Sequence, residues 1–197
     1  MINLEPATSA LTAVLDGVRE EQLRAPTPCT ESSLGDLIDH VDGLSWAFTA
    51  AATKTPIEGG SQPPSADAAR LGEHWRSRIP ERLAGLARAW RDEAAWMGMT
   101  QAGGLDLPAA VAGVVALNEV IVHGWDIAVA SGQAFECEPQ LLEAAYEFVQ
   151  SSVARNPHGS PGLFGPPVPV RDDAPLLDRL IGLTGRDPAW RAAGAHV

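Results

Sequence analysis

Cysteine and lysine are both scarce in this chain. Two cysteines, Cys29 and Cys137, occur in 197 residues, and they form neither a disulfide framework nor the spacing of a zinc–thiolate site. Lys54 is the only lysine, and it lies in a polar segment predicted to be a loop. These shortages argue against disulfide-stapled proteins, zinc fingers and enzymes that work through a lysine Schiff base.

Positive charge and long apolar runs are scarce as well. The formal net charge of -11 and the isoelectric point of about 4.8 disfavour binding to nucleic acid and to anionic membranes. No basic region ahead of an apolar stretch follows Met1, so no signal peptide is predicted. The longest apolar stretch, from Val111 to Val122, is interrupted by Asn118 and Glu119 and is too short to span a bilayer. We therefore expect a reduced, cytoplasmic protein without a nucleic-acid or membrane partner.

The apolar residues repeat at helical spacing over most of the chain. A hydrophobic content of 45% and a charged content of 20% are those of an ordinary globular protein, and the length predicts one domain, residues 1–197. Proline and glycine clusters predict loops at 54–64 and 156–173. The predicted helices are Pro6 to Leu23, Ser33 to Ala52, Ser65 to Trp96 with a bend near Pro80, Pro108 to Gly132, Pro139 to Val153 and Leu176 to Leu183.

No convincing alternation of apolar and polar residues predicts a strand, and neither a repeat nor a phosphate-binding glycine motif is present in the sequence. The expected fold class is all-α, a mostly up-and-down bundle of four or five helices. An irregular segment and a short final helix would follow the bundle.

Glu119 and His123 are the most informative residues of the chain. They lie four apart in a run from Leu107 to Ala130 that holds few other ionisable groups, and residues four apart share one face of a helix. A buried carboxylate without a partner is costly, and a divalent ion shared with an imidazole removes that cost. The pair therefore predicts a metal site, completed by a ligand from another helix, with open positions for water or substrate. A buried Glu–His hydrogen bond without metal is the alternative interpretation.

His40 is the candidate for that further ligand. It borders the apolar stripe of the second predicted helix; by itself such a histidine is more often a hydrogen-bonded core residue, and it is a candidate because the pair on the fourth helix needs a partner. His74, His158 and His196 are predicted to be solvated. His158, in a loop rich in proline and glycine, could also cover the mouth of a site.

Three other side chains could assist a metal site. Asp126 lies three residues after His123, and Asp36 lies four before His40, so either carboxylate could orient an imidazole through its second nitrogen. Helix capping is the favoured role of Asp36. Cys29 could be a reactive thiol near a helix N-terminus, although the role of a small buried hydrophobic residue is favoured.

Several segments carry a family resemblance. Residues 27–30 (TPCT) with 34–41 (LGDLIDHV), and residues 118–128 (NEVIVHGWDIA), resemble the two metal motifs of the mycothiol-dependent maleylpyruvate isomerase-like, DinB-related proteins of actinobacteria. The closing residues 164–170 (FGPPVPV), 176–184 and 185–188 (GRDP) are similar to a subgroup described only as metal-binding. The resemblance covers nearly the whole chain, and the string from Glu119 to Asp126 is its most specific part.

This resemblance implies a DinB-like four-helix bundle. It further implies a divalent ion, most often zinc, held by His40, Glu119 and His123. Two departures stand out. The isomerase itself is expected to have an additional C-terminal domain for which a chain ending at Val197 has no room, and the family often has a tryptophan where this chain has Ser32. We therefore expect the fold and the metal site to transfer, but not the isomerase reaction.

Three functional hypotheses follow from this reading. The leading one is a metal-dependent enzyme that acts on a small electrophile with a low-molecular-weight thiol such as mycothiol, by thiol transfer or thiol-assisted isomerisation, because cation binding favours the nucleophilic thiolate. The second is a hydrolase in which the metal activates water. The third is a non-catalytic domain that binds a metal or a small molecule. The substrate, the oligomeric state and the roles of Cys29, Asp126 and His158 stay open at this point.

Overall fold

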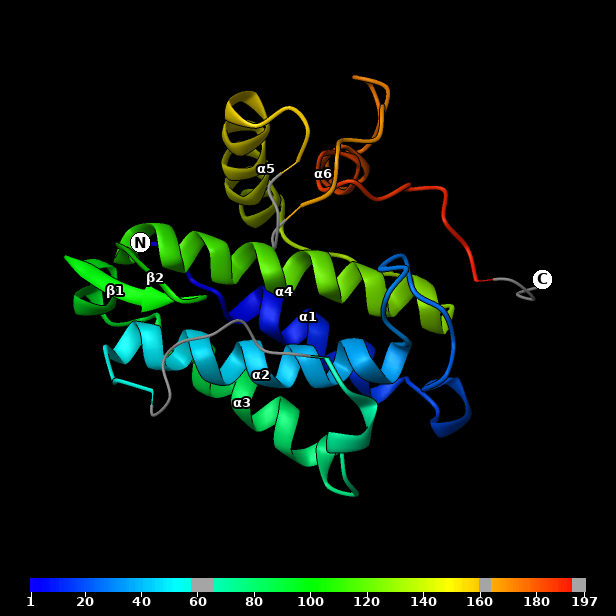
Figure 1. The fold of residues 1–197 in the computed structure, drawn as a ribbon, viewed down its shortest axis with the longest axis horizontal. Coiled ribbons are helices and arrows are strands. Elements are labelled where there is room, and N and C mark those ends of the chain that lie inside the picture. Colours follow the sequence, from blue (N-terminus) through cyan, green and yellow to red (C-terminus); the bar gives the residue numbers. More distant parts are fainter. Residues whose placement is uncertain (58–65, 160–163, 193–197) are drawn as a thin grey trace.

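Six α-helices and one short β-hairpin make up the described part of the chain, residues 1–57, 66–159 and 164–192 of a computed structural model (Figure 1). The hairpin consists of β1 (Met99–Ala102) and β2 (Leu105–Pro108). The predicted all-α class is confirmed. The helices are α1 (Glu5–Asp16), α2 (Leu34–Thr53), α3 (Trp75–Ala89), α4 (Ala109–Ser131), α5 (Pro139–Arg155) and α6 (Leu176–Leu183).

Helices α1 to α4 form the four-helix bundle. Both α1 and α2 pack against α3 and α4, so the order around the bundle is α1, α3, α2, α4. The Trp90 indole donates to the carbonyl of Phe48 (3.1 Å), which places the C-terminal ends of α2 and α3 together. Gln133, just after α4, donates to the carbonyl of Val14 near the end of α1 (2.9 Å). Glu5, at the start of α1, contacts Arg91, just after α3, so α1 and α3 are antiparallel. The helices therefore run up, down, down, up, whereas the sequence led us to expect a mostly alternating order.

Helix α4 lies between the other helices of the bundle and the pair formed by α5 and α6 (Figure 1). By length and composition, α4 could cross a membrane. The whole helix is longer than the apolar stretch from Val111 to Val122 on which the sequence prediction was based. Of its most apolar window, 72% is buried, as in the core helix of a soluble protein. This burial explains why α4 is apolar on nearly all sides.

Local signals set the ends of the helices that carry the candidate site. Ser33 caps α2: its Oγ accepts from the backbone N–H of Asp36 (3.2 Å), while the Asp36 carboxylate accepts from that of Ser33 (2.9 Å). The favoured capping role of Asp36 is thereby confirmed. Gly132 ends α4 with φ of 76°, a left-handed conformation that suits glycine.

Two of the predicted helices are longer than the observed ones. The first ends at Asp16 and not at Leu23, because Gly17 closes it and a separate 3-10 turn follows at Glu20–Gln22. The third, predicted from Ser65 to Trp96, is reduced to α3 between 3-10 turns at Ala68–Arg70 and Glu93–Trp96. The side chains of Asp67 and Asp92 accept backbone N–H groups at the start of those turns, which competes with helix extension. Ser65 and most of the predicted 54–64 loop lie outside the described residues.

The β-hairpin was not predicted from the sequence. Met99 pairs with Pro108 and Ala102 with Leu105 in antiparallel register. Gly103 and Gly104 form its turn with φ of 58° and 79°, the positive values that a tight hairpin turn requires. The strands are short and Thr100 is their one buried residue, so the alternation was too weak to detect.

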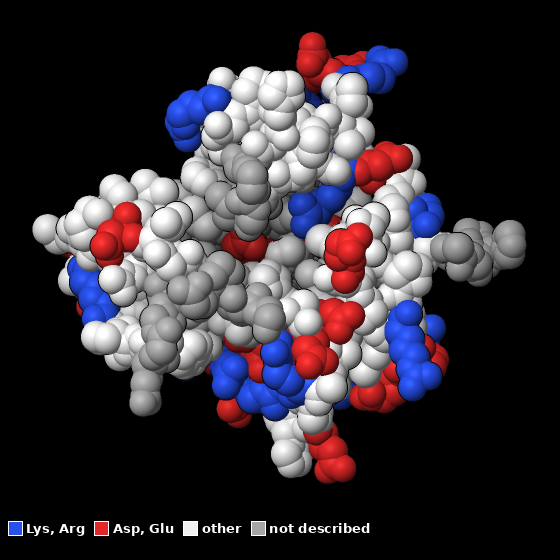
Figure 2. Space-filling model, viewed as in Figure 1, with Lys and Arg blue, Asp and Glu red and all other residues white. Residues whose placement is uncertain are grey.

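Ion pairs join α2 to the segment that contains α3. Asp42 contacts Arg78 and Arg82 at 2.9 Å each, and Asp39 contacts Arg70. Both aspartates are buried, so arginine partners compensate for the loss of their hydration. Figure 2 shows basic and acidic side chains gathered together over this part of the molecule.

Gly113 allows two tryptophans to pack against the backbone of α4. A Cβ atom there would lie 2.6 Å from Trp96 Cζ3 and 2.8 Å from Trp90 Cζ3. Both indoles are held by hydrogen bonds, Trp90 to Phe48 and Trp96 to the carbonyl of Trp90 (2.8 Å). Neither ring can move away without losing such a bond.

Gly113→Ala is expected to lower the free energy of unfolding by about 1–3 kcal/mol, because overpacking outweighs the better helix propensity of alanine. The matched control is Gly85→Ala on α3, where the nearest atom to a new Cβ is Arg88 Nη2 at 3.8 Å. This control should leave stability unchanged or raise it by up to about 1 kcal/mol. Urea denaturation followed by circular dichroism measures both, and equal effects of the two substitutions would contradict the prediction.

Candidate metal centre

The three predicted ligands meet between α2 and α4. His40 comes from α2, and Glu119 and His123 come from one face of α4. One potential ligand atom from each of them lies within 4.8 Å of the others. The His123 Nε2 atom is 3.0 Å from Glu119 Oε2, and the ring centroids of His40 and His123 are 5.1 Å apart with the rings nearly perpendicular. Two imidazoles and a carboxylate are a donor set that suits zinc and similar divalent ions.

This trio is largely shielded from solvent. The side chain of His123 is 10% exposed and that of Glu119 is 14% exposed, whereas His40 is half-buried. Figure 2 shows a hollow between the part formed by α5 and α6 and the part formed by α2, with acidic atoms visible inside it. The donor set is therefore placed where a bound cation would compensate for burial of the carboxylate.

Asp126 supports His123 from the opposite side of the ring. Its Oδ2 atom accepts a hydrogen bond from His123 Nδ1 (3.1 Å), and its side chain is fully buried. With Nδ1 bonded to Asp126, Nε2 is the ring nitrogen that faces Glu119, and it becomes a metal ligand when it loses its proton. The predicted orienting role of Asp126 therefore has the geometry it requires.

Arg186 is the residue of this region that the sequence reasoning missed. Its Nε donates to Asp126 Oδ1 (2.8 Å) and its Nη2 to Asp126 Oδ2 (2.9 Å), a two-pronged ion pair with a side chain that is 11% exposed. One signal was present in the sequence: a buried aspartate in an apolar helix needs a cation. Nothing in the sequence spacing identified which of the 13 arginines it would be.

Gly185 brings Arg186 into place after α6. Its φ is 85°, and a Cβ atom there would lie 2.8 Å from the Cα atom of Gly165. Both the left-handed backbone and the close approach of the chain at Gly165 require glycine at this position. The turn after α6 thus aims the guanidinium of Arg186 at α4.

Cys29 joins the same cluster from the loop before α2. Thr27 shapes this loop, since its Oγ1 accepts from the N–H of Cys29 (3.1 Å) and donates to the carbonyl of Ser32 (2.9 Å). The Cys29 Sγ atom then lies 3.5 Å from Asp126 Oδ2 and accepts from Arg186 Nη2 at 3.1 Å. Cys29 is therefore a polar contact of the site, whereas a small buried hydrophobic residue had been favoured.

Charges within the cluster control its protonation. Burial alone would lower the pKa of His123, but hydrogen bonds with Asp126, Cys29 and Glu119 together raise it well above its usual value. Burial alone would raise the pKa of Glu119, yet His123 lowers it through a hydrogen bond and its charge. Burial alone would also raise the pKa of Asp126, but the charge of Arg186 lowers it. Two carboxylates thus surround the imidazole.

The other histidines do not join the trio. His74 and His158 are exposed, as predicted, and His196 lies outside the described residues. A cleft of about 390 Å3 runs beside the cluster, with Cys29, Phe164 and Arg186 in its lining. His158 is not part of that lining, and the trio is not part of it either.

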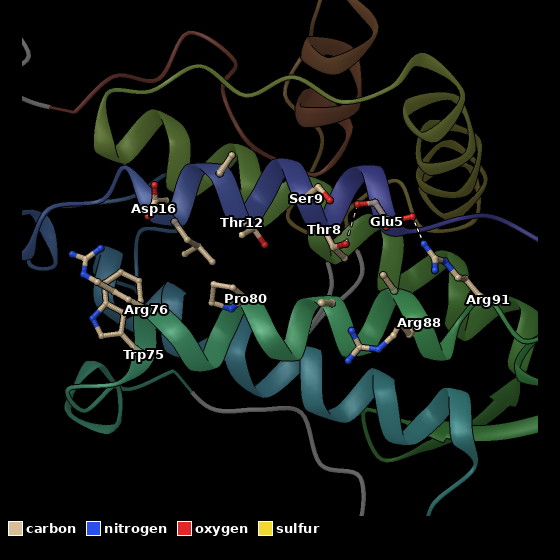
Figure 3. A pocket seen from close by; sticks show the side chains of 14 residues that line it. Glu5, Thr8, Ser9, Thr12, Asp16, Trp75, Arg76, Pro80, Arg88 and Arg91 are labelled. Carbon is tan, nitrogen blue, oxygen red and sulfur yellow. Dashed lines mark hydrogen bonds and ion pairs between the residues drawn. The ribbon is translucent and has the colours of Figure 1, made fainter.

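A separate groove of about 580 Å3 lies between α1 and α3 (Figure 3). Thr8, Ser9 and Thr12 line it from α1, and Pro80 and Arg88 line it from α3. Among the described residues its lining holds no histidine or cysteine. The groove is therefore distinct from the candidate metal centre.

By its fold and by this cluster, the protein belongs to the class of helical bundles with a buried candidate site for one divalent ion.

The sequence matches the family described as mycothiol maleylpyruvate isomerase N-terminal domain over residues 4–128. The chain therefore belongs to that family. Two relatives from Mycobacterium tuberculosis, the uncharacterized proteins MT0763 and Rv0738, are each 31% identical over 91% of this chain and 93% of their own.

A solved structure shows the same fold. The crystal structure of the mycothiol-dependent maleylpyruvate isomerase matches with a TM-score of 0.66 at 19% identity, over 98% of this chain and 91% of that one. The expectation that the isomerase has a C-terminal domain without a counterpart here is therefore wrong. Helices α5 and α6 belong to the shared fold, because the match extends over nearly all of both chains.

Cys137 lies outside the cluster, and burial raises the pKa of its thiol to about 11. In the Cys29→Ser variant, the rate of alkylation of Cys137 by iodoacetamide should rise about tenfold per pH unit between pH ~7 and ~10, because the thiolate reacts. Mass spectrometry of the modified protein gives the rate. A plateau reached below pH ~9 would contradict the raised pKa.

Proposed function

We propose that this protein is a divalent-metal-dependent enzyme that uses a low-molecular-weight thiol, such as mycothiol, to act on a small electrophile. The supporting observation is the convergence of His40, Glu119 and His123 within 4.8 Å in a largely buried position. Membership of a family named for a mycothiol-dependent isomerase adds the class of thiol. Zinc is the metal that the two histidines and one glutamate suit best.

In this proposal His40, Glu119 and His123 hold the metal. A bound divalent cation favours the thiolate form of a thiol, which is the nucleophile for thiol transfer or thiol-assisted isomerisation. Asp126 keeps a proton on His123 Nδ1, so that Nε2 stays available as a ligand. Arg186 neutralises Asp126 and holds it in this orientation.

Small-molecule access suits the cleft next to Cys29, Phe164 and Arg186. We also propose that residues 1–197 act as one domain, because Arg186 of the C-terminal segment reaches Asp126 of α4. A cytoplasmic location is proposed because low-molecular-weight thiols and free cysteines stay reduced there.

Metal content tests the ligand trio directly. Protein purified without chelator is expected to hold a single divalent ion per chain, and His40→Ala, Glu119→Ala and His123→Ala should each lose it, because two ligands seldom retain zinc. Asp126→Asn should weaken binding about 10- to 100-fold, as loss of an orienting partner does. Elemental mass spectrometry after dialysis measures the metal.

His74→Ala is the matched control, because His74 is exposed and its side chain caps nothing. It should keep the full metal content. Wild-type protein that stays metal-free after reconstitution with zinc would refute the metal centre and leave the buried Glu–His hydrogen bond as the interpretation of this pair.

Turnover assays separate the three functional hypotheses. Metal-loaded protein is expected to convert maleylpyruvate or another small electrophile only when a thiol is added, and removal of the metal should abolish the reaction. The readout is loss of substrate absorbance with and without mycothiol. Ester hydrolysis without thiol would favour the hydrolase instead, and full metal content without any turnover would favour the non-catalytic binding domain.

A further inference from the structure

His123 belongs to two sets of potential metal ligands. The first is the trio with His40 and Glu119, and the second combines His123 with Cys29 and Asp126. In each set the ligand atoms lie within 4.8 Å of one another. Nε2 of the ring is the atom nearest Glu119, and Nδ1 is the atom bonded to Asp126, so the two sets approach opposite edges of one imidazole.

A cation already occupies the second set, namely the guanidinium of Arg186. Its nitrogens lie 2.8 and 2.9 Å from the two oxygens of Asp126 and 3.1 Å from the Cys29 Sγ atom. Asp126 is fully buried and the Arg186 side chain is 11% exposed. The lone pairs that a metal would need are therefore engaged, and a metal ion among them would lie next to a positive charge in a poorly hydrated place.

We infer that Arg186 acts as a built-in cation that prevents a second divalent ion from binding to Cys29, Asp126 and His123. This inference rests on the proposed function, since the first ion is the one that the trio holds. Arg186 thereby limits the centre to one metal and keeps the thiol of Cys29 out of its coordination. Sulfur, nitrogen and carboxylate ligands together suit zinc, cobalt or cadmium.

Removal of the guanidinium would expose the second set to metal. Asp126 would then be a buried carboxylate without a cation, which is strongly unfavourable. A divalent ion would replace the lost charge, and its binding would displace the protons of the Cys29 thiol and of His123 Nδ1 into solvent. Methionine at position 186 keeps much of the length of the side chain but carries no charge.

The test uses cobalt, because thiolate ligands give Co2+ an intense charge-transfer absorption in the near ultraviolet. Wild-type protein should bind a single Co2+ per chain without that band. Arg186→Met should bind a second ion and gain the band, and the double variant Arg186→Met with Cys29→Ser should lose both. Arg186→Lys, which keeps a positive charge, is the matched control and should resemble the wild type. Elemental analysis of zinc-loaded protein gives an independent count.

The outcomes separate this inference from the proposed function. Wild-type protein that binds no metal refutes the proposed function itself. Wild-type protein with a thiolate band that Cys29→Ser removes would show that Cys29 is already a ligand and would overturn the inference, even if Arg186→Met failed to fold. A folded Arg186→Met variant, verified by its thermal melt, that binds only one ion without the band would overturn the inference and leave the proposed trio intact.

Discussion

The candidate centre depends on the buried ion pair between Asp126 and Arg186. Asp126 lies in the largely buried helix α4 and its side chain is 0% exposed. Removal of the partner of a buried carboxylate in such a position costs roughly 3–5 kcal/mol. Arg186 supplies the charge from the far end of the chain. Since Asp126 also bonds to His123, the ion pair determines which edge of that imidazole faces the other ligands.

The same pair connects three regions that are distant in the sequence. The loop before α2 supplies Cys29, α4 supplies Asp126, and the turn after α6 supplies Arg186. Each region contacts the other two through polar atoms at 2.8–3.5 Å. The packing of α5 onto α4 and of α6 onto α5 is thus tied to the candidate centre, to which the C-terminal segment contributes Arg186.

Helix α4 serves as a core element and as the support of the site at once. Most of its side chains are buried and apolar, and Gly113 lets aromatic rings approach its backbone closely. A helix held this firmly keeps Glu119, His123 and Asp126 in fixed positions, as an ordered site requires. The neighbouring α2 is held by its Ser33 cap and by ion pairs to arginines near α3, which keeps His40 in register.

Periodicity and spacing in the sequence determined the helical class, the approximate positions of the helices and the pairing of Glu119 with His123, because these depend on residues close together along the chain. The need of this pair for a further ligand made His40 a candidate, and the resemblance of short motifs supported it. The tertiary structure alone decided that α1 and α2, which follow each other in the sequence, are not adjacent in the bundle. It also decided that Met99–Pro108 forms a hairpin and that Cys29 lies beside Asp126. Above all, it decided that Arg186 is the arginine that neutralises Asp126. Sixty residues separate the two, and only the packing of α5 onto α4 and of α6 onto α5 brings their side chains together.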